Sequence, residues 1–180
     1  FTTGSGQATT PYGSAPNGEV EDYDVWIADA PKDYGDLVDT TSGTGTGNYQ
    51  TYYTNNGPRH GMGDGYYYLG SGWGSHVDYE ADANISGFAD GDAYDDGVSF
   101  GTLMQGQSAQ ITVTASQAGY LNAWIDWNRD GDFADSGEKI ANEQAVTGGA
   151  NTITVSVPAP AITGNDLGAR FRFTSTPGQA

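Results

Sequence analysis

The sequence predicts an all-β protein, a β-sandwich or jelly-roll-like fold with long acidic loops and very little helix. Its 180 residues include 28 Gly and few strong helix formers, a composition that suits strands joined by tight turns. Short segments alternate apolar and polar residues with a period of two, and no segment shows a convincing apolar period of 3.6 residues. The 12 Tyr, 6 Phe and 4 Trp argue against disorder, which is usually poor in aromatic residues.

The clearest strand pattern lies in residues 97–174. Ile111 and Val113 alternate with polar residues, and so do Ile153, Val155 and Val157, which is typical of strands that bury one face. Short strands separated by turn residues indicate a sandwich. The strands expected here span residues 98–104, 109–114, 119–127, 152–157 and 169–174.

The first 96 residues contain fewer strand signals. Residues 1–18 are rich in turn formers and resemble a linker, whereas residues 19–27 alternate well enough to form a strand. Gly, Asp, Thr and Asn dominate residues 29–65, which we expect to be a loop with little regular structure. A short strand at residues 66–69 and a second long acidic loop at residues 70–96 complete this part.

The charge balance limits the partners of this chain. It has 23 acidic and 6 basic residues, a formal net charge of −17. Such a surface repels nucleic acid and anionic membranes, and divalent cations are its natural counter-charge. No stretch approaches the roughly 20 apolar residues of a membrane span, so we expect no membrane insertion. The absence of Cys excludes catalytic thiols and thiolate metal sites.

The strongest candidate site is the acidic stretch from residue 126 to residue 138. Calcium takes six to eight oxygen ligands, and a loop wrapped around the ion offers side chains at alternate positions followed by a Gly at the sharp turn. The start of this stretch fits that pattern, but its twelfth position is Gly137 and the preceding residues read as a strand, so we expect an EF-hand-like loop on a sheet. A solvated acidic turn is the alternative. The candidate ligands are Asp126, Asn128, Asp130, Asp132, Asp135 and Glu138.

Two further acidic regions are predicted to bind calcium, and for the first of them a solvated loop is the alternative. The first places seven carboxylates within 19 residues without a Lys or Arg: Asp78, Glu80, Asp82, Asp90, Asp92, Asp95 and Asp96. In the second, carboxylates that share one face of a strand repel each other unless a cation lies between them. Its candidate ligands are Glu19, Glu21, Asp22 and the nearby Asp36. We therefore expect several Ca²⁺ ions.

The two ends of the chain resemble each other. Residues 1–8 (FTTGSGQA) and residues 173–180 (FTSTPGQA) are identical at five of eight positions. Chance similarity of two polar tails is one explanation. The other is a unit cut from a tandem array, or a subunit that joins its neighbour head to tail. The missing initiator Met also indicates a processed product or a piece of a longer protein. We divide the chain into a linker and strand (1–27) and a sandwich body (28–180), loop-rich over 29–96 and strand-rich over 97–174.

The run Gly-Glu-Val-Glu-Asp-Tyr at residues 18–23 resembles the motif for which the GEVED domain family is named. Other stretches that are similar to the family are residues 33–37, 95–98, 121–126 with the following loop, and 169–173. The resemblance implies a secreted or surface protein of bacteria with a role in matrix, adhesion or filaments and no catalytic activity. In that family the Gly-Glu-Val-Glu-Asp-Tyr strand usually comes last, whereas here it comes first. It therefore either completes the sheet of a neighbouring unit or folds back on its own chain.

Together these observations predict a structural calcium-binding subunit or tandem repeat of an extracellular bacterial filament or adhesin. Its partners are copies of itself, and its place is outside the cell, on the cell surface or in the biofilm matrix. We expect no enzyme, because His60 and His76 lie in polar, Gly-rich loops and no nucleophile, zinc or phosphate-loop motif is present. The alternative is a calcium-dependent carbohydrate-binding module, in which the aromatic residues at 52–53, 66–68 and 73 stack on glycans.

Overall fold

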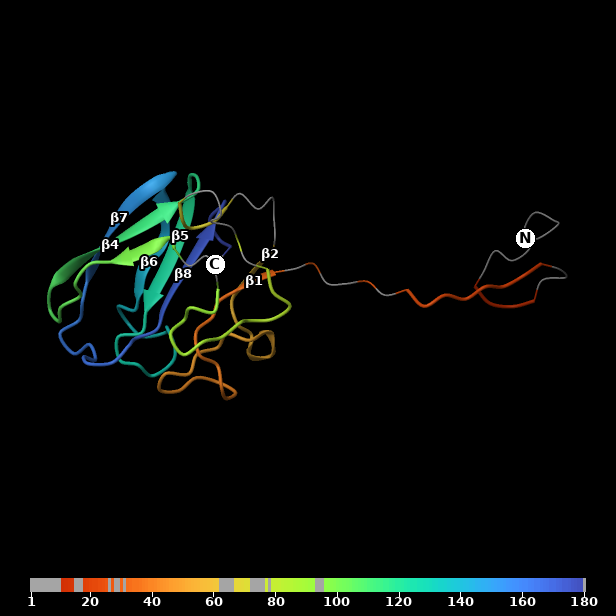
Figure 1. Cartoon of the computed structure of the whole chain (residues 1–180), viewed down its shortest axis with the longest axis horizontal. Coiled ribbons are helices and arrows are strands. Elements are labelled where there is room, and N and C mark those ends of the chain that lie inside the picture. The colour runs from red at the N-terminus through yellow and green to blue at the C-terminus, as the bar shows by residue number, and fades with distance from the viewer. Residues whose placement is uncertain are drawn as a thin grey trace.

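The computed structural model describes residues 11–14, 18–25, 27, 30, 32–61, 67–71, 77, 79–92 and 96–179. The chain is all-β, as predicted, and its only helical element among these residues is the 3₁₀ turn Tyr53–Asn55. The strands are β1 (Lys32–Tyr34), β2 (Arg59–Gly61), β3 (Val98–Phe100), β4 (Ser108–Ala115), β5 (Gly119–Ile125), β6 (Lys139–Val146), β7 (Gly149–Ser156) and β8 (Ala169–Thr174) (Figure 1). No helix in these ranges has the length and apolar character needed to cross a membrane.

Two antiparallel three-stranded sheets form the body, in the orders β3-β4-β7 and β6-β5-β8, and β1 pairs with β2 beside them. The short connection between β6 and β7 joins the sheets along one side. On the other side the edge strands β3 and β8 approach each other, with the rings of Phe100 and Phe171 in contact at 5.9 Å. The sandwich is therefore closed at one side and has two strand edges at the other.

The core lies between the two sheets and follows the period-two pattern of the sequence. Ile111 and Val113 of β4 face Leu121 and Ala123 of β5, and all four side chains have an exposed fraction of 0%. Burial of each large aliphatic side chain stabilises the fold by about 1.5–3 kcal/mol. Apolar alternation therefore placed these strands correctly, because each buries one face.

The structure corrects several predictions in the polar parts of the chain. β6 was not predicted, because this edge strand buries only Ala141 and Val146. A bulge opposite Asn122, whose Oδ1 accepts the N–H of Glu143 at 3.0 Å, further breaks its alternation. β1 and β2 lie inside the stretch 29–65 that we expected to be irregular. The expected strand at 98–104 ends at residue 100. In the stretch 66–69, residue 66 lies outside the described residues and Leu69 forms only an isolated bridge, to Ala115.

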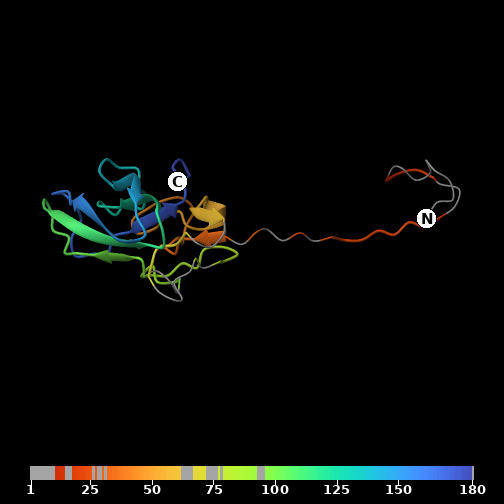
Figure 2. The ribbon, with the colours of Figure 1, turned by 90° about the horizontal axis from the view of Figure 1, so that it is seen from above.

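The described residues of the stretch 18–27, which we call the arm, are extended and lead away from the body (Figures 1 and 2). The strand predicted at 19–27 is wrong for this chain by itself, since the described residues of the arm pair with no other strand. A strand needs a partner for its backbone N–H and C=O groups. The exposed fractions of Val20, Tyr23, Val25 and Ile27 range from 77% to 85%.

Candidate calcium site

The loop of residues 126–138 connects β5 to its antiparallel neighbour β6. Asp126 follows the last residue of β5 and Glu138 precedes the first residue of β6. The Ile125 N–H donates to the Glu138 carbonyl oxygen at 2.9 Å, which closes the base of the loop. The exposed fractions of Asp126 and Glu138 are 0% and 2%, so the sheet fixes two buried carboxylates on opposite sides of the loop entrance.

Side-chain oxygens of the loop accept backbone N–H groups a few residues ahead and so wind the chain into a compact turn. Asp126 Oδ2 accepts from Gly131 N–H at 2.9 Å, and Asn128 Oδ1 accepts from Asp130 N–H at 3.1 Å. Asp130 Oδ1 then accepts from Asp132 N–H at 3.2 Å. This is the local mechanism by which alternating Asp and Asn residues specify a turn.

Gly131 is required by the close approach of a second loop. Its φ is +94°, and a Cβ at this position would lie 1.9 Å from the carbonyl oxygen of Gly45. Only glycine fits both conditions. The loop of residues 45–48 therefore presses against the turn and holds it in place.

The remaining polar side chains of the loop converge between the two buried carboxylates. Asn128 Nδ2 donates to Asp130 Oδ2 at 3.0 Å and to Asp135 Oδ2 at 2.7 Å. Glu138 accepts from the N–H of Asp135 at 3.1 Å and from that of Trp127 at 3.2 Å. Residues at both ends and in the middle of the loop thus share one small volume.

The electrostatics of the loop are unfavourable without a cation. Burial raises the pKa of Glu138, and the neighbouring charges of Asp126, Asp130 and Asp135 act in the same direction. Among the described residues, no Lys or Arg forms an ion pair with a loop carboxylate. The loop therefore gathers negative charge that a bound cation would neutralise.

Tyr49 ties this loop to the rest of the body. Its hydroxyl donates to Asp126 Oδ2 at 3.0 Å and accepts from Gly168 N–H at 2.9 Å. Burial, together with the charge of Asp126, raises the pKa of Tyr49 to about 12. Sequence analysis did not identify Tyr49, because 77 residues separate it from Asp126 and no local pattern marks it.

The donor set fits calcium. Carboxylate, amide and carbonyl oxygens are its preferred ligands, and the loop offers them from Asp126, Asn128, Asp130, Asp135 and Glu138. A half-turn of the Asn128 amide would present its oxygen where its nitrogen now bridges two carboxylates. Asp132 accepts from Ala134 N–H at 2.8 Å and lies at the rim. Among the described residues, no group of three or more Asp, Glu or His side chains is arranged so that it could hold a metal ion.

The other predicted ligands are distributed over the structure. Asp36 Oδ2 accepts the Gly91 N–H at 2.8 Å, and Asp82 Oδ1 accepts the N–H groups of Tyr53 and Ala83 at 2.7 and 2.9 Å. Asp90 Oδ1 accepts the Ser86 hydroxyl at 2.6 Å, and the Asp90 N–H donates to Ser86 Oγ at 2.8 Å. Burial raises the pKa of Asp36, which is 6% exposed. Glu80 accepts from Tyr34 N–H at 3.3 Å, and Asp92 and Asp96 lie on the same loop region. Asp78 and Asp95 lie outside the described residues.

Glu19, Glu21 and Asp22 are exposed on the arm, and Glu21 accepts a hydrogen bond from the Tyr23 hydroxyl. Within the described residues, the arm carboxylates do not meet Asp36, with which they were grouped from the sequence. Among the described residues, the loop 126–138 brings the largest set of its predicted ligands together. Asp36 also lies near Asp90 and Asp92, since it accepts the Gly91 N–H and the charge of Asp90 acts to raise its pKa.

Comparison with known proteins gives one match. Residues 120–180 match the GEVED domain, a stretch that holds β5, the candidate calcium loop, and β6 to β8. The run Gly18 to Tyr23 lies outside the matched stretch. No curated protein and no solved structure matches the chain.

Proposed function

We propose that this chain is a structural calcium-binding subunit, or one repeat, of an extracellular bacterial filament or adhesin, without catalytic activity. The observation that supports calcium binding is the convergence of loop 126–138, where Asp126 and Glu138 are buried beside three further oxygen-bearing side chains. Units join head to tail, and calcium stiffens the loops between strands.

Two features support assembly of copies. The arm exposes four large apolar side chains, which cost free energy in water unless a partner covers them. The similarity of residues 1–8 to residues 173–180 indicates a unit that repeats. The GEVED match at residues 120–180 supports the surface-protein setting by resemblance.

The test is thermal unfolding and electron microscopy of the same sample, first in millimolar calcium and then with excess chelator. Calcium that binds only the folded chain raises the free energy of unfolding by about 2.7 kcal/mol per site at a hundredfold excess over Kd. We expect a large fall in Tm on chelation, with filaments that loosen. Identical melting curves and particles in both conditions would refute the calcium role.

Glycan binding is the second candidate function, and one exposed aromatic side chain, Tyr53, supports it. Tyr53 is 55% exposed, and the guanidinium of Arg59 lies 4.7 Å from its centroid, an arrangement that offers a stacking face and donors. Tyr67, by contrast, packs on Phe173 at 5.7 Å, as expected of a ring that holds a loop on the core. A lectin would bind glycans as a monomer, and loss of that binding in Tyr53→Ala would favour this candidate.

A further inference from the structure

The body has two strand edges along its open side. β8 ends the sheet β6-β5-β8 and β3 ends the sheet β3-β4-β7, and the described residues include no strand that pairs with the outer edge of either. A free edge presents backbone N–H and C=O groups that can pair with another strand.

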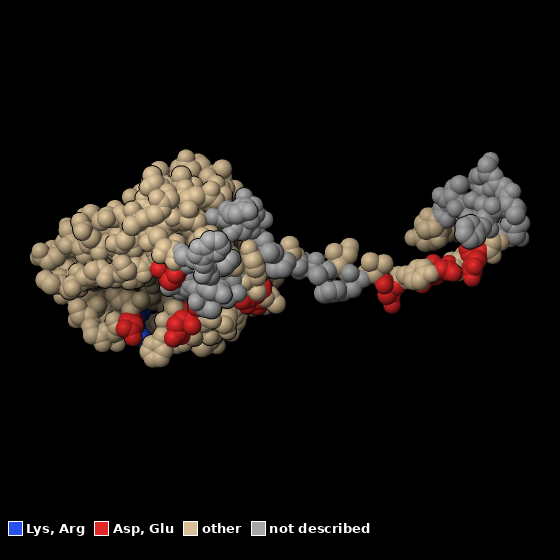
Figure 3. All heavy atoms as spheres, turned by 45° about the horizontal axis from the view of Figure 1, so that its top comes forward, with Lys and Arg blue, Asp and Glu red and all other residues tan. Residues whose placement is uncertain are grey.

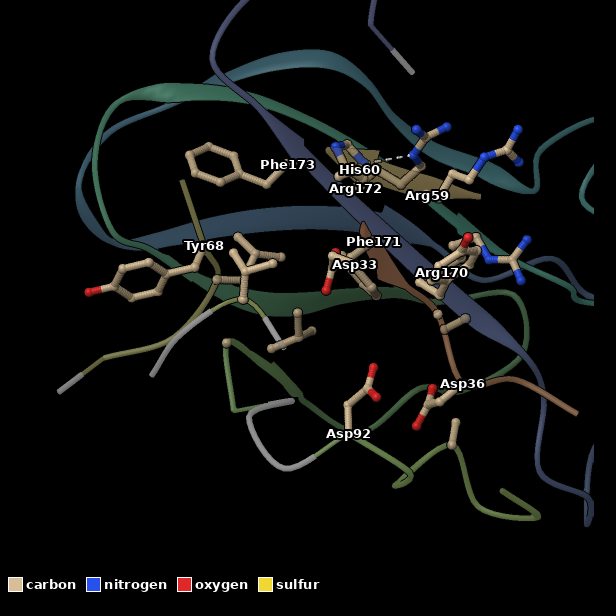
Figure 4. A pocket seen from close by; sticks show the side chains of 18 of the residues that line it. Asp33, Asp36, Arg59, His60, Tyr68, Asp92, Arg170, Phe171, Arg172 and Phe173 are labelled. Atoms are coloured by element: carbon tan, nitrogen blue, oxygen red, sulfur yellow. Dashed lines mark hydrogen bonds between the residues drawn. The ribbon is translucent and has the colours of Figure 1, made fainter. Parts of the chain in front are cut away.

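A groove of about 1020 Å³ runs along this side (Figure 4). One wall is β8, and the opposite wall includes Leu69, Val98 and Phe100. The volume lies at the upper end of the range for ligand pockets, and a strand edge forms one wall.

β8 shows a different chemistry on each of its faces. Phe171 and Phe173 face the apolar side, where they contact Phe100 and Tyr67 at 5.9 and 5.7 Å. Arg170 and Arg172 lie on the other side of the ribbon (Figure 4). Arg170 Nη2 donates to Gln50 O and Thr51 Oγ1 at 3.1 Å, and Arg172 Nε donates to His60 Nε2 at 3.0 Å.

The groove concentrates the scarce positive charge of the chain. Three of its six basic residues, Arg59, Arg170 and Arg172, line it. None of them forms an ion pair with a carboxylate of the described residues. Burial, followed by the charge of Arg172, lowers the pKa of Arg170 to about 10. The three guanidiniums are only partly buried, and the charges of Asp36 and Asp39 act on Arg170 without forming an ion pair with it among the described residues.

The groove also contains the carboxylates of Asp33, Asp36 and Asp92. Asp36 and Asp92 lie at the opposite end in Figure 4, and Asp36 Oδ2 already accepts Gly91 N–H at 2.8 Å. Asp33 lies beside β8, on β1. An acidic partner would therefore be attracted to the β8 side of the groove and repelled from the far end.

The arm has the complementary pattern. Figure 3 shows acidic side chains along it, whereas blue appears only within a hollow of the body. Its sequence from Asp22 to Val25 alternates acidic and apolar residues, Asp-Tyr-Asp-Val, and β8 alternates basic and apolar residues, Arg-Phe-Arg-Phe, from Arg170 to Phe173.

Paired strands keep directly opposite side chains on the same face. An arm paired with β8 so that Asp22 and Asp24 lie on the side of Arg170 and Arg172 therefore places Tyr23 and Val25 on the side of Phe171 and Phe173. This holds for either strand direction, because both strands alternate with a period of two. One register satisfies the charges and the apolar side chains together.

The sequence pattern also indicates where the occupant comes from. Residues 173–180, which begin within β8, resemble residues 1–8, which precede the arm. This similarity favours the arm of a second copy of this chain as the segment that lies next to β8.

We infer that residues 18–27 of a second copy of this chain add as a strand to the free edge of β8, with Asp22 and Asp24 against Arg170 and Arg172 and with Tyr23 and Val25 in the apolar part of the groove. This inference rests on the proposed function and specifies its head-to-tail contact. The mechanism is strand addition, in which main-chain hydrogen bonds supply affinity and side-chain pockets supply specificity.

The test is a charge swap in the full chain. One variant carries Asp22→Arg with Asp24→Arg, and the other carries Arg170→Asp with Arg172→Asp. Each alone sets like charges against each other and should assemble at least tenfold more weakly than wild type, measured by light scattering against concentration. Mixed one to one, they regain opposite charges at every junction and should assemble again.

Matched controls separate position from net charge. Glu143→Arg with Asp166→Arg makes the same charge change on exposed residues outside the arm and groove, and it should assemble like wild type. Should the β8 variant not fold, a peptide of residues 18–27 added to the wild-type chain must dissolve the assemblies, and the same peptide with both Asp changed to Arg must not.

The outcomes separate this inference from the proposed function. Calcium-dependent filaments that survive the arm variant would overturn the inference and leave the function standing. A wild-type chain that stays monomeric at every concentration, with and without calcium, would overturn both. If each variant alone assembles more weakly and the mixture does not recover, the arm contacts its own chain rather than a second copy. That outcome would also overturn the inference.

Discussion

Asp39, in the loop after β1, and Asp126, in the loop after β5, are both almost fully buried carboxylates, with exposed fractions of 2% and 0%. Asp39 Oδ2 accepts the N–H groups of Thr51 and Tyr52 at 2.8 Å, and its Oδ1 accepts from Asn55 Nδ2 at 2.6 Å. Asp126 also accepts hydrogen bonds, but further carboxylates of its own loop surround it.

The difference shows which buried carboxylate indicates a metal. A single carboxylate surrounded by N–H donors is neutralised by those dipoles and acts as a structural cap. Several carboxylates that share one volume repel each other, and only a cation relieves all of them at once. In this acidic chain we therefore expect convergence of several carboxylates, rather than burial of one, to mark a candidate calcium ligand.

The largest effect on the free energy of unfolding is expected from substitution of Asp39, the buried carboxylate that accepts N–H groups. Asp39→Ala leaves two backbone N–H groups and the Asn55 amide buried without an acceptor, so it should lower the free energy of unfolding by about 3 kcal/mol. The loss should be equal in calcium and in chelator, measured by urea unfolding. Asp39→Asn, which keeps one acceptor oxygen, should lose clearly less. A loss confined to calcium would make Asp39 a ligand and break the comparison.

The second effect separates the two loops by their response to calcium. Asp130→Asn with Asp135→Asn keeps the shape of the loop and removes two exposed charges. It should cost up to about 2.7 kcal/mol in calcium at a hundredfold excess over the wild-type Kd, and less than about 0.5 kcal/mol in chelator. The control is Glu143→Gln with Asp166→Asn, which makes the same charge change elsewhere. Equal losses in both conditions would refute the site.

The smallest expected effect is a dependence of the free energy of unfolding on pH, measured in the presence of chelator. Because burial raises the pKa of Glu138, the folded chain binds this proton more tightly than the unfolded chain. The resulting stability is present below the ordinary value of 4.5 and is lost as pH rises through the raised pKa. Glu138→Gln should remove a slope of at most about 1.4 kcal/mol per pH unit.

Calcium should reverse the sign of this dependence, because the ion binds the ionised carboxylate. Unfolding of wild type and Glu138→Gln from pH 4 to pH 8, with and without calcium, measures both slopes. Parallel curves for the two proteins would show that Glu138 has an ordinary pKa.

The sequence predicted the sandwich strands and the compact acidic turn of residues 126–138 because both depend on local patterns, and calcium binding by that turn stays a prediction. Ile111 and Val113 alternate within one strand, and Asp126, Asn128 and Asp130 alternate within one turn. It missed β6 because an edge strand with a bulge buries too few residues to show a period. It grouped Asp36 with the arm carboxylates because it had no information on distance in space.

The sequence by itself determined the all-β class, the acidic character, and the spacing of oxygen donors from Asp126 to Glu138, since each follows from composition or from neighbours along the chain. Only the tertiary structure decided that Tyr49 contacts Asp126 and that Asp39 is a cap. It also decided that Arg170 and Phe171 of β8 face opposite sides of a groove. These features depend on contacts between residues far apart in sequence, and such contacts are fixed by packing rather than by any local pattern.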